Sequence, residues 1–514
     1  MSARSPLPAR RLRRGALLTA SLAVPVLLVS GCAGSGAAAS SAGGSSALKW
    51  ASSYFPKHWD PVVSGSGAQF RELALVYASL TRTDDKGNAV PDLATSWDYN
   101  STGDEITFHL RPNLTFSDGT PVNASAVQTA LERAKTQKDS AIFGDLTSIK
   151  SVTTSGELDV LVHLTQTDYQ IPLLFGERVL QIASPKAAAD PAKLDQQPIG
   201  AGPFIVTELI PGTKAVLKKN PNYWDAKNIH IDNVQLVSAP DVATVVSGLQ
   251  TGVYNFADIP ASQLAAANSA GLATFVQPGF NANNLSLNVN KAPFNNPKVV
   301  DAVRYAINRK EFVDKLTFGS GQATAQPFPP GYVAYDPQST DPYPYDLTKA
   351  KQLLSAAGYQ PGQIKLTLDI PSAQPDAEIV QSQLAKIGIT VSIKVDKNWA
   401  TPFFAKELAF SLYGTTGRDS AVQTLTAHFG PHGPLNLSAP YEPAGFEAAI
   451  AKVRQTPLGA ADYASVLQTA TRAGLQSRAL VFTYSSPNLY AKNKSISVLP
   501  ANPGHLDWTG VTIG

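Results

Sequence analysis

The 514-residue sequence is almost without sulfur, with one cysteine, Cys32, and one methionine, Met1. A single cysteine excludes a disulfide within the chain, and its N-terminal position argues against a thiol catalyst. Once Met1 is removed and Cys32 is modified, no thiolate or thioether remains for soft metals. Among the seven histidines, His428 and His432 are four residues apart, but the Gly-Pro pair between them breaks the helix that would align them. We therefore expect no directly bound metal.

Acidic residues are missing from the N-terminal segment, which instead is rich in arginine. Without these arginines the net charge of +3 becomes −2. A near-neutral body offers no general electrostatic attraction for a polyanion, so we expect no nucleic-acid partner. The arginines that lie before residue 32 are Arg4, Arg10, Arg11, Arg13 and Arg14.

Sequence motifs of common enzyme classes are also missing. The chain has no Walker A, H-E-x-x-H or C-x-x-C pattern. The SGSG at 64–67 lies in a loop-like tract without the strand-turn-helix context of a serine hydrolase, and Ser46 with Lys49 matches S-x-x-K without its partner motifs. The sequence predicts neither an enzyme nor a cofactor.

The N-terminus has the three-part layout of a secretory signal. Residues 1–14 are basic, residues 15–30 are apolar and a small-residue site follows. The apolar run is short for a membrane-spanning helix, which needs about 20 residues, and Pro25 interrupts it. The paired arginines fit either the general or the twin-arginine export route.

The apolar run ends in LVSGC, which resembles the lipobox of bacterial lipoproteins. This resemblance implies cleavage after Gly31 and lipidation of Cys32, and acyl chains on both the thiol and the new amino terminus would give stable anchoring. We predict a signal peptide at 1–31 and a flexible linker at 32–47. A linker of about 15 small residues spans roughly 20 Å, so the body is expected outside the cytoplasm and close to the membrane.

The remaining chain is long enough for at least two lobes. Short apolar strands alternate with amphipathic helices, and a helix with a polar N-cap is predicted at 123–134. The apolar spacing at 299–316 predicts one continuous helix. Asp346 and Gly358 read as the start and stop of another helix. Strands at 364–370 and 389–395 around a helix predict a β-α-β unit in a mixed α/β fold.

Four blocks in this order resemble the family 5 bacterial extracellular solute-binding proteins, the peptide- and nickel-binding group of ABC importers. The most specific block, 77–134, contains PDLATSW and FSDGTP; the next, 200–224, contains GAGPF and NPNYW. In these blocks Gly119, Gly200 and Gly202 are expected where turns need a positive φ or a close approach of backbones. The other two blocks are FNNPKVVDAVRYAINRKEFVDKLTFGSGQATAQPFPPG and YPYDLTKAKQLLSAAGY.

The resemblance implies a two-lobe clamshell of the periplasmic-binding-protein type, with mixed sheets and an extra subdomain. We predict a discontinuous lobe I at 48–285 plus 481–514, carrying the subdomain at about 66–198, and lobe II at 286–480. The chain would cross near Asn288 and Tyr484, and ligand would bind between the lobes. The implied partners are a small solute and a membrane permease, and we expect a monomer.

The resemblance also suggests ligand-binding residues. Asp419 falls where peptide-binding members place the carboxylate that pairs with the ligand's free amine. This chain has Arg418-Asp419-Ser420 where the family often has D-P. A ligand carboxylate on Arg418 is therefore also open, as is a structural role in which the two charges lie in a solvated loop or pair with each other. The further candidate cleft residues, each equally compatible with core packing or a structural role, are Tyr54, Phe55, Trp399, Tyr413, Asn283 and Asn284.

The substrate stays open between related alternatives. An oligopeptide is the first expectation, and a metal chelate such as a nickel complex, or another solute such as an oligosaccharide, is the second. A receptor that signals rather than feeds a transporter would have the same sequence features.

Overall fold

The computed structural model describes residues 46–64, 69–84, 87–176, 178–239, 243–415, 420–497 and 506–514, with side chains 278–281 and 415 left aside. The chain divides into two compact units, Met1–Gly44 and Ser45–Gly514. The second unit carries the fold presented below. The predicted signal peptide and Cys32, and most of the linker, lie outside the described residues. No helix in the described ranges is long and apolar enough to cross a membrane.

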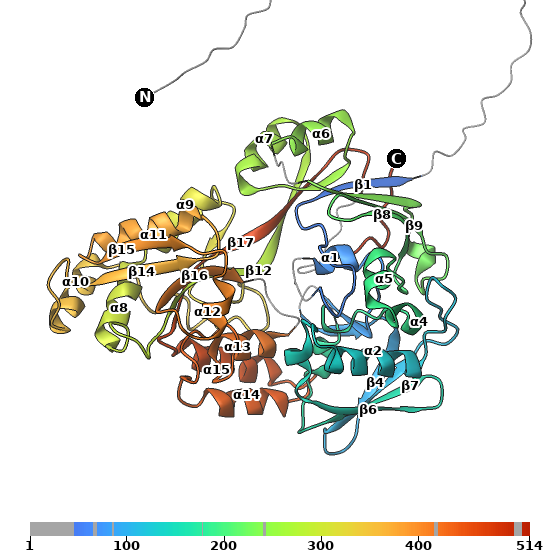
Figure 1. Cartoon of the computed structure of the whole chain (residues 1–514), viewed down its shortest axis with the longest axis horizontal. Coiled ribbons are helices and arrows are strands. Elements are labelled where there is room, and N and C mark those ends of the chain that lie inside the picture. The colour runs from blue at the N-terminus through green and yellow to red at the C-terminus, as the bar shows by residue number, and fades with distance from the viewer. Residues whose placement is uncertain are drawn as a thin grey trace, which may run out of the picture. The chain divides into compact units, whose positions relative to one another are not determined.

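One mixed sheet of eleven strands runs through the unit Ser45–Gly514 (Figure 1). β1 pairs in parallel with β10 and β11, and β14 pairs in parallel with β15 and β16. The β14–β15 pair confirms the predicted β-α-β unit. In sheet order the strands are β15 (Thr390–Val395), β14 (Lys365–Ile370), β16 (Phe410–Thr415), β12 (Ala273–Leu287), β17 (Leu480–Lys492), β11 (Phe256–Asp258), β1 (Ala47–Ser52), β10 (Asn233–Ser238), β9 (Lys214–Lys219) and β8 (Phe204–Ile210), with β13 (Gln322–Ala323) against β17.

Two long antiparallel strands, β12 and β17, connect the two halves of this sheet. Residues 273–277 of β12 pair with 488–492 of β17, and residues 281–286 pair with 480–486. The register shifts after Gln277 and again after Asn283, and such irregularities bend a strand. We call the elements on the β11 side the first lobe and those on the β16 side the second lobe.

A subdomain of the first lobe is built on an antiparallel sheet. Ile106, Phe108 and Leu110 of β5 are buried on one face, as strand alternation requires. Asn123 accepts a hydrogen bond from the Ala126 amide and caps α2, as predicted. The subdomain contains β2 (Thr81–Thr83) and β3 (Ala89–Pro91), the sheet β4 (Ala94–Tyr99), β5 (Glu105–Leu110), β7 (Asp159–Leu164) and β6 (Ile149–Ser155), and α2 (Ala124–Thr136), η1 (Phe143–Leu146), α3 (Ile171–Leu174) and η2 (Arg178–Leu180).

The rest of the first lobe packs around β1. Trp50 is fully buried against Phe256 and Trp508, with ring centroids 5.7 and 5.8 Å away. A Cβ on Gly200 would lie 2.2 Å from the Val76 carbonyl oxygen, which confirms the predicted close approach of backbones. The helices of this lobe are α1 (Phe70–Leu73), α4 (Pro185–Ala188), α5 (Pro191–Gln196), η3 (Ala226–Asn228), α6 (Val245–Thr251), η4 (Ala261–Gln263) and α7 (Leu264–Ser269).

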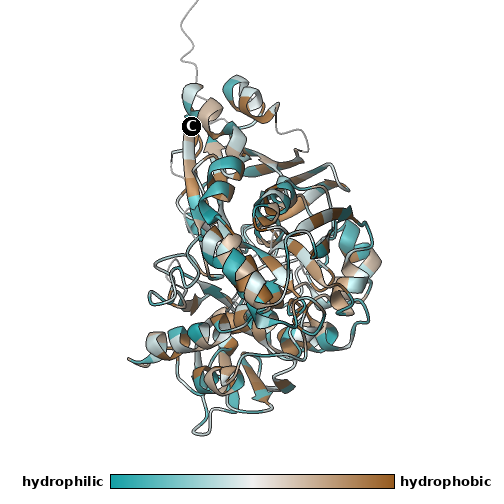
Figure 2. Ribbon diagram, turned by 90° about the vertical axis from the view of Figure 1, so that its left-hand side faces the viewer, coloured by the Kyte–Doolittle hydropathy of each residue, from teal (hydrophilic) through white to brown (hydrophobic). Residues whose placement is uncertain are grey.

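The second lobe covers its strands with amphipathic helices, and Figure 2 shows hydrophobic and hydrophilic segments alternating along them. Two apolar cores form, one centred on Leu285, Val303 and Leu368 and the other on Leu425 and Leu467. The helices are α8 (Pro297–Ala306), α9 (Arg309–Leu316), α10 (Leu347–Ala356), α11 (Pro375–Ala385), α12 (Ala400–Phe404), α13 (Ala421–Phe429), α14 (Phe446–Arg454) and α15 (Tyr463–Leu475).

The prediction of a single helix at 299–316 is wrong, because the structure has two helices there. α8 ends at Ala306, and Asn308 starts α9 by accepting a hydrogen bond from the Glu311 amide. Its own amide donates to Gln383 Oε1 at 3.0 Å. An N-cap residue takes an extended conformation, so the capping asparagine interrupts a pattern whose apolar spacing is continuous.

Candidate ligand-binding site

The second-lobe candidates lie on two neighbouring strands. Asn284 of β12 is directly opposite Tyr413 of β16, and Asn283 is opposite Gly414. The Tyr413 hydroxyl donates to the Leu435 carbonyl at 2.9 Å, and its side chain is 5% exposed. The structure therefore brings three sequence candidates together from segments more than a hundred residues apart.

An aromatic cluster surrounds Tyr413. Trp399 stacks on Phe403 with centroids 4.4 Å apart, and both rings contact Tyr413. The Trp399 indole donates to Ser411 Oγ at 2.8 Å, which fixes the ring against β16. Phe404, next to the cluster, is 52% exposed. Such a partly exposed aromatic group can hold an apolar ligand side chain.

Asn284 is fully buried and incompletely hydrogen-bonded. Its Oδ1 accepts from Ser286 Oγ at 3.3 Å, but within the described part of the chain its Nδ2 has no hydrogen-bond partner. Asn283 is half-buried, and its carbonyl accepts from Thr483 Oγ1 at 2.9 Å. Buried polar groups are nearly always paired, so an unpaired amide donor at this position of β12 is unusual.

Gln277, on the same strand, was not among the sequence candidates. It is 1% exposed, and neither its Nε2 nor its Oε1 has a partner among the residues that the structure describes. It lies opposite Asn488, just before the register shift of β12. A single glutamine within a strand gives no sequence signal that its side chain is buried. Only the structure identifies Gln277 as a buried, unpaired amide.

The first-lobe candidates lie beyond the end of β1. Tyr54 is 43% exposed, and the Arg71 guanidinium lies 5.1 Å from its ring centroid. The Tyr54 amide donates to Ser52 Oγ at 3.0 Å. Phe55 is 8% exposed and packs edge-on against Trp59. Tyr54 thus presents an exposed ring, whereas Phe55 belongs to the apolar core of the lobe.

A buried charge cluster lies behind Tyr54. Arg71 Nη1 is 3.4 Å from Asp258 Oδ1 and donates to the Tyr490 hydroxyl. Arg71 Nη2 is 4.0 Å from Glu72 Oε1, which accepts from Ser52 Oγ at 2.7 Å. Two carboxylates therefore share one guanidinium, and the sequence analysis did not find this arrangement.

The surroundings of this cluster shift its titration. Burial raises the pKa of Glu72 to about 7, although Arg71 lowers it. Burial alone would lower the pKa of Arg71, but Asp258 and Glu72 raise it above its ordinary value. Burial likewise raises the pKa of the Tyr54 hydroxyl. Arg71 is therefore charged at all ordinary pH values, and Glu72 changes charge near neutrality.

Arg418 and Asp419 lie outside the described residues. The segment that contains them follows β16, whose last residue is Thr415. It precedes α13, where Ser420 and Gln423 form a reciprocal capping box. Their proposed contact with ligand termini stays a prediction.

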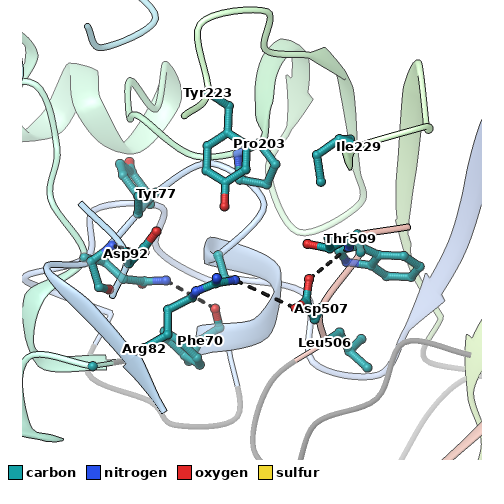
Figure 3. A pocket seen from close by; sticks show the side chains of 16 residues that line it. Phe70, Tyr77, Arg82, Asp92, Pro203, Tyr223, Ile229, Leu506, Asp507 and Thr509 are labelled. Atoms are coloured by element: carbon teal, nitrogen blue, oxygen red, sulfur yellow. Dashed lines mark hydrogen bonds and ion pairs between the residues drawn. The ribbon is translucent and has the colours of Figure 1, made fainter. Parts of the chain in front are cut away.

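A cavity of about 60 Å³ lies inside the first lobe, between α1, the β2–β3 region and residues 506–509 (Figure 3). Arg82 is 3.8 Å from Asp507, and Asp92 accepts from the Ser79 amide and the Trp224 indole. This volume holds a few water molecules. Because Arg82 pairs with Asp507 and Asp92 accepts two hydrogen bonds from neighbouring segments, we interpret the cavity as part of the packing between the subdomain and the rest of the lobe.

In the described ranges, no group of three or more His, Cys, Asp or Glu side chains is arranged so that it could hold a metal ion. His428 is buried, and its Nδ1 is 2.8 Å from the Thr424 carbonyl oxygen. That histidine therefore belongs to the packing of α13.

Comparison with known proteins identifies the class. The family "Bacterial extracellular solute-binding proteins, family 5 Middle" matches residues 88–433, so the chain belongs to this family, as predicted. Among its relatives is di/tripeptide-binding protein 3 of Pseudomonas aeruginosa strain UCBPP-PA14. It is 28% identical over 412 residues, covering 73% of this chain and 77% of the relative.

Solved structures confirm the clamshell fold. DppA of Helicobacter pylori in complex with the peptide STSA superposes with a TM-score of 0.78 at 23% identity, covering 91% of this chain and 98% of that structure. NikZ of Campylobacter jejuni in complex with Ni(L-His) gives a TM-score of 0.77 at 20% identity, covering 91% and 99%. The predicted α/β clamshell with a subdomain is therefore correct, while the predicted lobe boundaries remain predictions.

Proposed function

We propose that this chain is the substrate-binding lipoprotein of an ABC importer, which captures a short peptide between its lobes and delivers it to a membrane permease. The observation that carries the proposal is the family match over residues 88–433, together with a di/tripeptide-binding relative that covers most of both chains. The family consists of binding proteins, and we infer that this chain likewise has no enzymatic activity.

The buried amides of β12 support a peptide ligand. A peptide backbone carries an N–H donor and a C=O acceptor at every residue. Asn284 offers an unpaired donor, and Gln277 offers both a donor and an acceptor. The aromatic cluster around Tyr413 would take an apolar side chain of the peptide.

The charged ends of the peptide need opposite charges. We infer that Asp419 pairs with the free amine and that Arg418 takes a carboxylate, because both contacts are charge-assisted hydrogen bonds. Tyr54 would close the first-lobe side with its exposed ring. In this scheme the charged groups select the ends of the ligand, and the neutral amides hold its backbone.

A metal chelate is the second candidate, favoured by the fold shared with NikZ in complex with Ni(L-His). A histidine or other organic ligand around the metal presents amines and carboxylates, which the same amides and charges would bind. The metal would then reach the site within its chelate and would need few protein ligands.

We further infer that Cys32 carries the lipid anchor, and that the protein is a monomer outside the cytoplasm. Replacing Cys32 with serine should move the protein from the membrane fraction into the soluble extracytoplasmic fraction. Continued membrane association of the Cys32→Ser protein in a cell fractionation would refute the anchor.

A thermal-shift screen of the unit Ser45–Gly514 tests the substrate. The panel contains di- to pentapeptides, their N-acetylated forms, Ni(L-His) and short oligosaccharides. A ligand at 100 times its Kd stabilises a protein by about 2.7 kcal/mol, which shifts the melting temperature measurably. We expect peptides with a free amino terminus to raise the melting temperature and N-acetylated peptides to leave it unchanged. A shift with the chelate or sugars but not with peptides contradicts the peptide assignment.

A further inference from the structure

A segment of the subdomain reaches across to the second lobe. The Tyr169 amide donates to the Arg454 carbonyl at 2.8 Å, and Gln170 Nε2 lies 3.5 Å from the Val453 carbonyl. The Tyr463 hydroxyl donates to Gln170 Oε1 at 2.8 Å. Three contacts thus join segments that are almost three hundred residues apart in sequence.

These contacts are made to the end of a helix. Val453 and Arg454 are the last residues of α14, where backbone carbonyls run out of partners further along the helix. The Val453 carbonyl still accepts from the Thr456 amide at 3.0 Å. The Tyr169 amide supplies such a partner for Arg454. In Figure 1, α14 lies at the lower end of the second lobe, away from the crossing strands β12 and β17. The contact is therefore remote from the strands about which the lobes would move.

An ion pair accompanies the hydrogen bonds. Arg454 Nε lies 3.6 Å from Asp168 Oδ2, and the Asp168 side chain is 5% exposed. Burial raises the pKa of this carboxyl, and Arg454 lowers it. Within the subdomain, the Tyr99 hydroxyl donates to the Asp168 carbonyl at 2.9 Å, which holds the segment in place. A buried carboxylate needs its partner, so separating the lobes would require water to replace Arg454.

A second point of contact lies on the same side. The turn between β2 and β3 passes so close to Tyr332 of the second lobe that a Cβ on Gly87 would lie 2.7 Å from the ring. Gly87 has a φ of +88°, which favours glycine at this turn. The subdomain therefore touches the second lobe through two separate segments.

We propose that residues 168–170 and their partners Val453, Arg454 and Tyr463 form a clasp that holds the two lobes together. The proposal rests on the proposed function, because it gives the clasp a role: it stabilises the closed state and slows ligand release without touching the ligand. The four-stranded sheet of the subdomain is separate from the eleven-stranded sheet. The subdomain would thus hold the two lobes in the closed state.

Distances between spin labels test the clasp without any ligand. Nitroxides are attached through Lys138→Cys on the subdomain and Lys351→Cys on α10, two exposed positions in a unit that has no other cysteine. Tyr463→Phe removes one hydroxyl and keeps the ring, and Arg454→Ala removes the ion pair. Tyr441→Phe is the matched control, because that hydroxyl accepts only from the Arg478 amide within the second lobe among the hydrogen bonds found for it.

We expect the ratio of closed to open populations to fall about fivefold in Tyr463→Phe, and about tenfold in Arg454→Ala, with no change in the control. Distributions that are identical in all four proteins overturn the clasp. An equal change in the control also overturns it, since the effect would then not depend on the bridging contact. A silent peptide screen beside a shifted distribution would refute the peptide function and leave the clasp standing.

Discussion

Two sets of buried polar side chains in this molecule differ in how they are satisfied. Behind Tyr54, Arg71 stands between two carboxylates, those of Glu72 and Asp258, within the body of the first lobe. On β12, Gln277 and Asn284 are neutral and leave three amide atoms without a partner in the described part of the chain. Arg71 Nη2 and Glu72 Oε2 also lack a hydrogen-bond partner in the described part of the chain, but opposite charges lie next to them. The neutral amides of β12 have no such attraction.

Under the proposed function, this difference separates a structural role from a binding role. Removing one member of a buried ion group leaves the others uncompensated, so the fold itself depends on the charge cluster. An unpaired buried amide lowers the stability of the empty protein, and a ligand that pairs with it recovers that loss as affinity. Substitutions in the two sets should therefore act in opposite directions on stability and binding.

The largest expected effect follows from Arg71→Ala. Glu72 and Asp258 would remain buried without a cation, and such a change typically costs about 3–5 kcal/mol. Urea unfolding at pH 7.5 measures the loss. Lys310→Ala is the control, because its pair with Asp314 is exposed and should contribute less than about 0.5 kcal/mol. A loss in Arg71→Ala no larger than in the control would show that the cluster is not a stabilising element.

A smaller effect, visible as pH dependence, follows from Glu72→Gln. The folded pKa of Glu72, about 7, exceeds its ordinary value of 4.5, so the fold favours the neutral acid. This contribution is fully present below about pH 4.5 and is lost as pH rises through 7, by up to about 3 kcal/mol. The Glu72→Gln protein has no carboxyl at this position and therefore lacks this loss.

The comparison is made on the difference between the two unfolding free energies, measured by urea titration from pH 5 to pH 8. The variant should gain on the wild type as pH rises, because other titrating groups, including Asp258, are common to both proteins. A difference that stays constant over this range would mean that Glu72 is ionised throughout.

The sequence could predict the features of local structure that depend on residues close together in the chain. Asp346 accepts from the Lys349 amide and begins α10, as its position before an amphipathic pattern indicates. The β-α-β unit was predicted in the same way. The break at Asn308 was missed because the apolar spacing continues through it, while its cap and its contact with Gln383 decide against a continuous helix.

The candidate site could not be predicted in full, because its contacts join residues that are far apart in the chain. Nothing in the sequence around Arg71 indicates its burial, which depends on Asp258 and Tyr490, 187 and 419 residues further along the chain. Tyr413 and Asn284 were predicted separately, and only strand pairing shows that they face each other. Gln277 has no local signal at all, because polar residues in strands are usually exposed.

The smallest expected effect, and the sharpest contrast with Arg71, follows from Gln277→Met. Methionine has a similar length without an amide to leave unpaired, so the empty protein should be more stable by about 1 kcal/mol. Peptide affinity should fall about fivefold if Gln277 makes the proposed hydrogen bonds to the peptide backbone, because methionine cannot form them. Calorimetry measures both quantities, with the peptide that gives the largest thermal shift. Gln128→Met is the control, because the hydrogen bonds found for this amide of α2 all lie within the subdomain. A less stable variant with unchanged affinity would place Gln277 with the structural set.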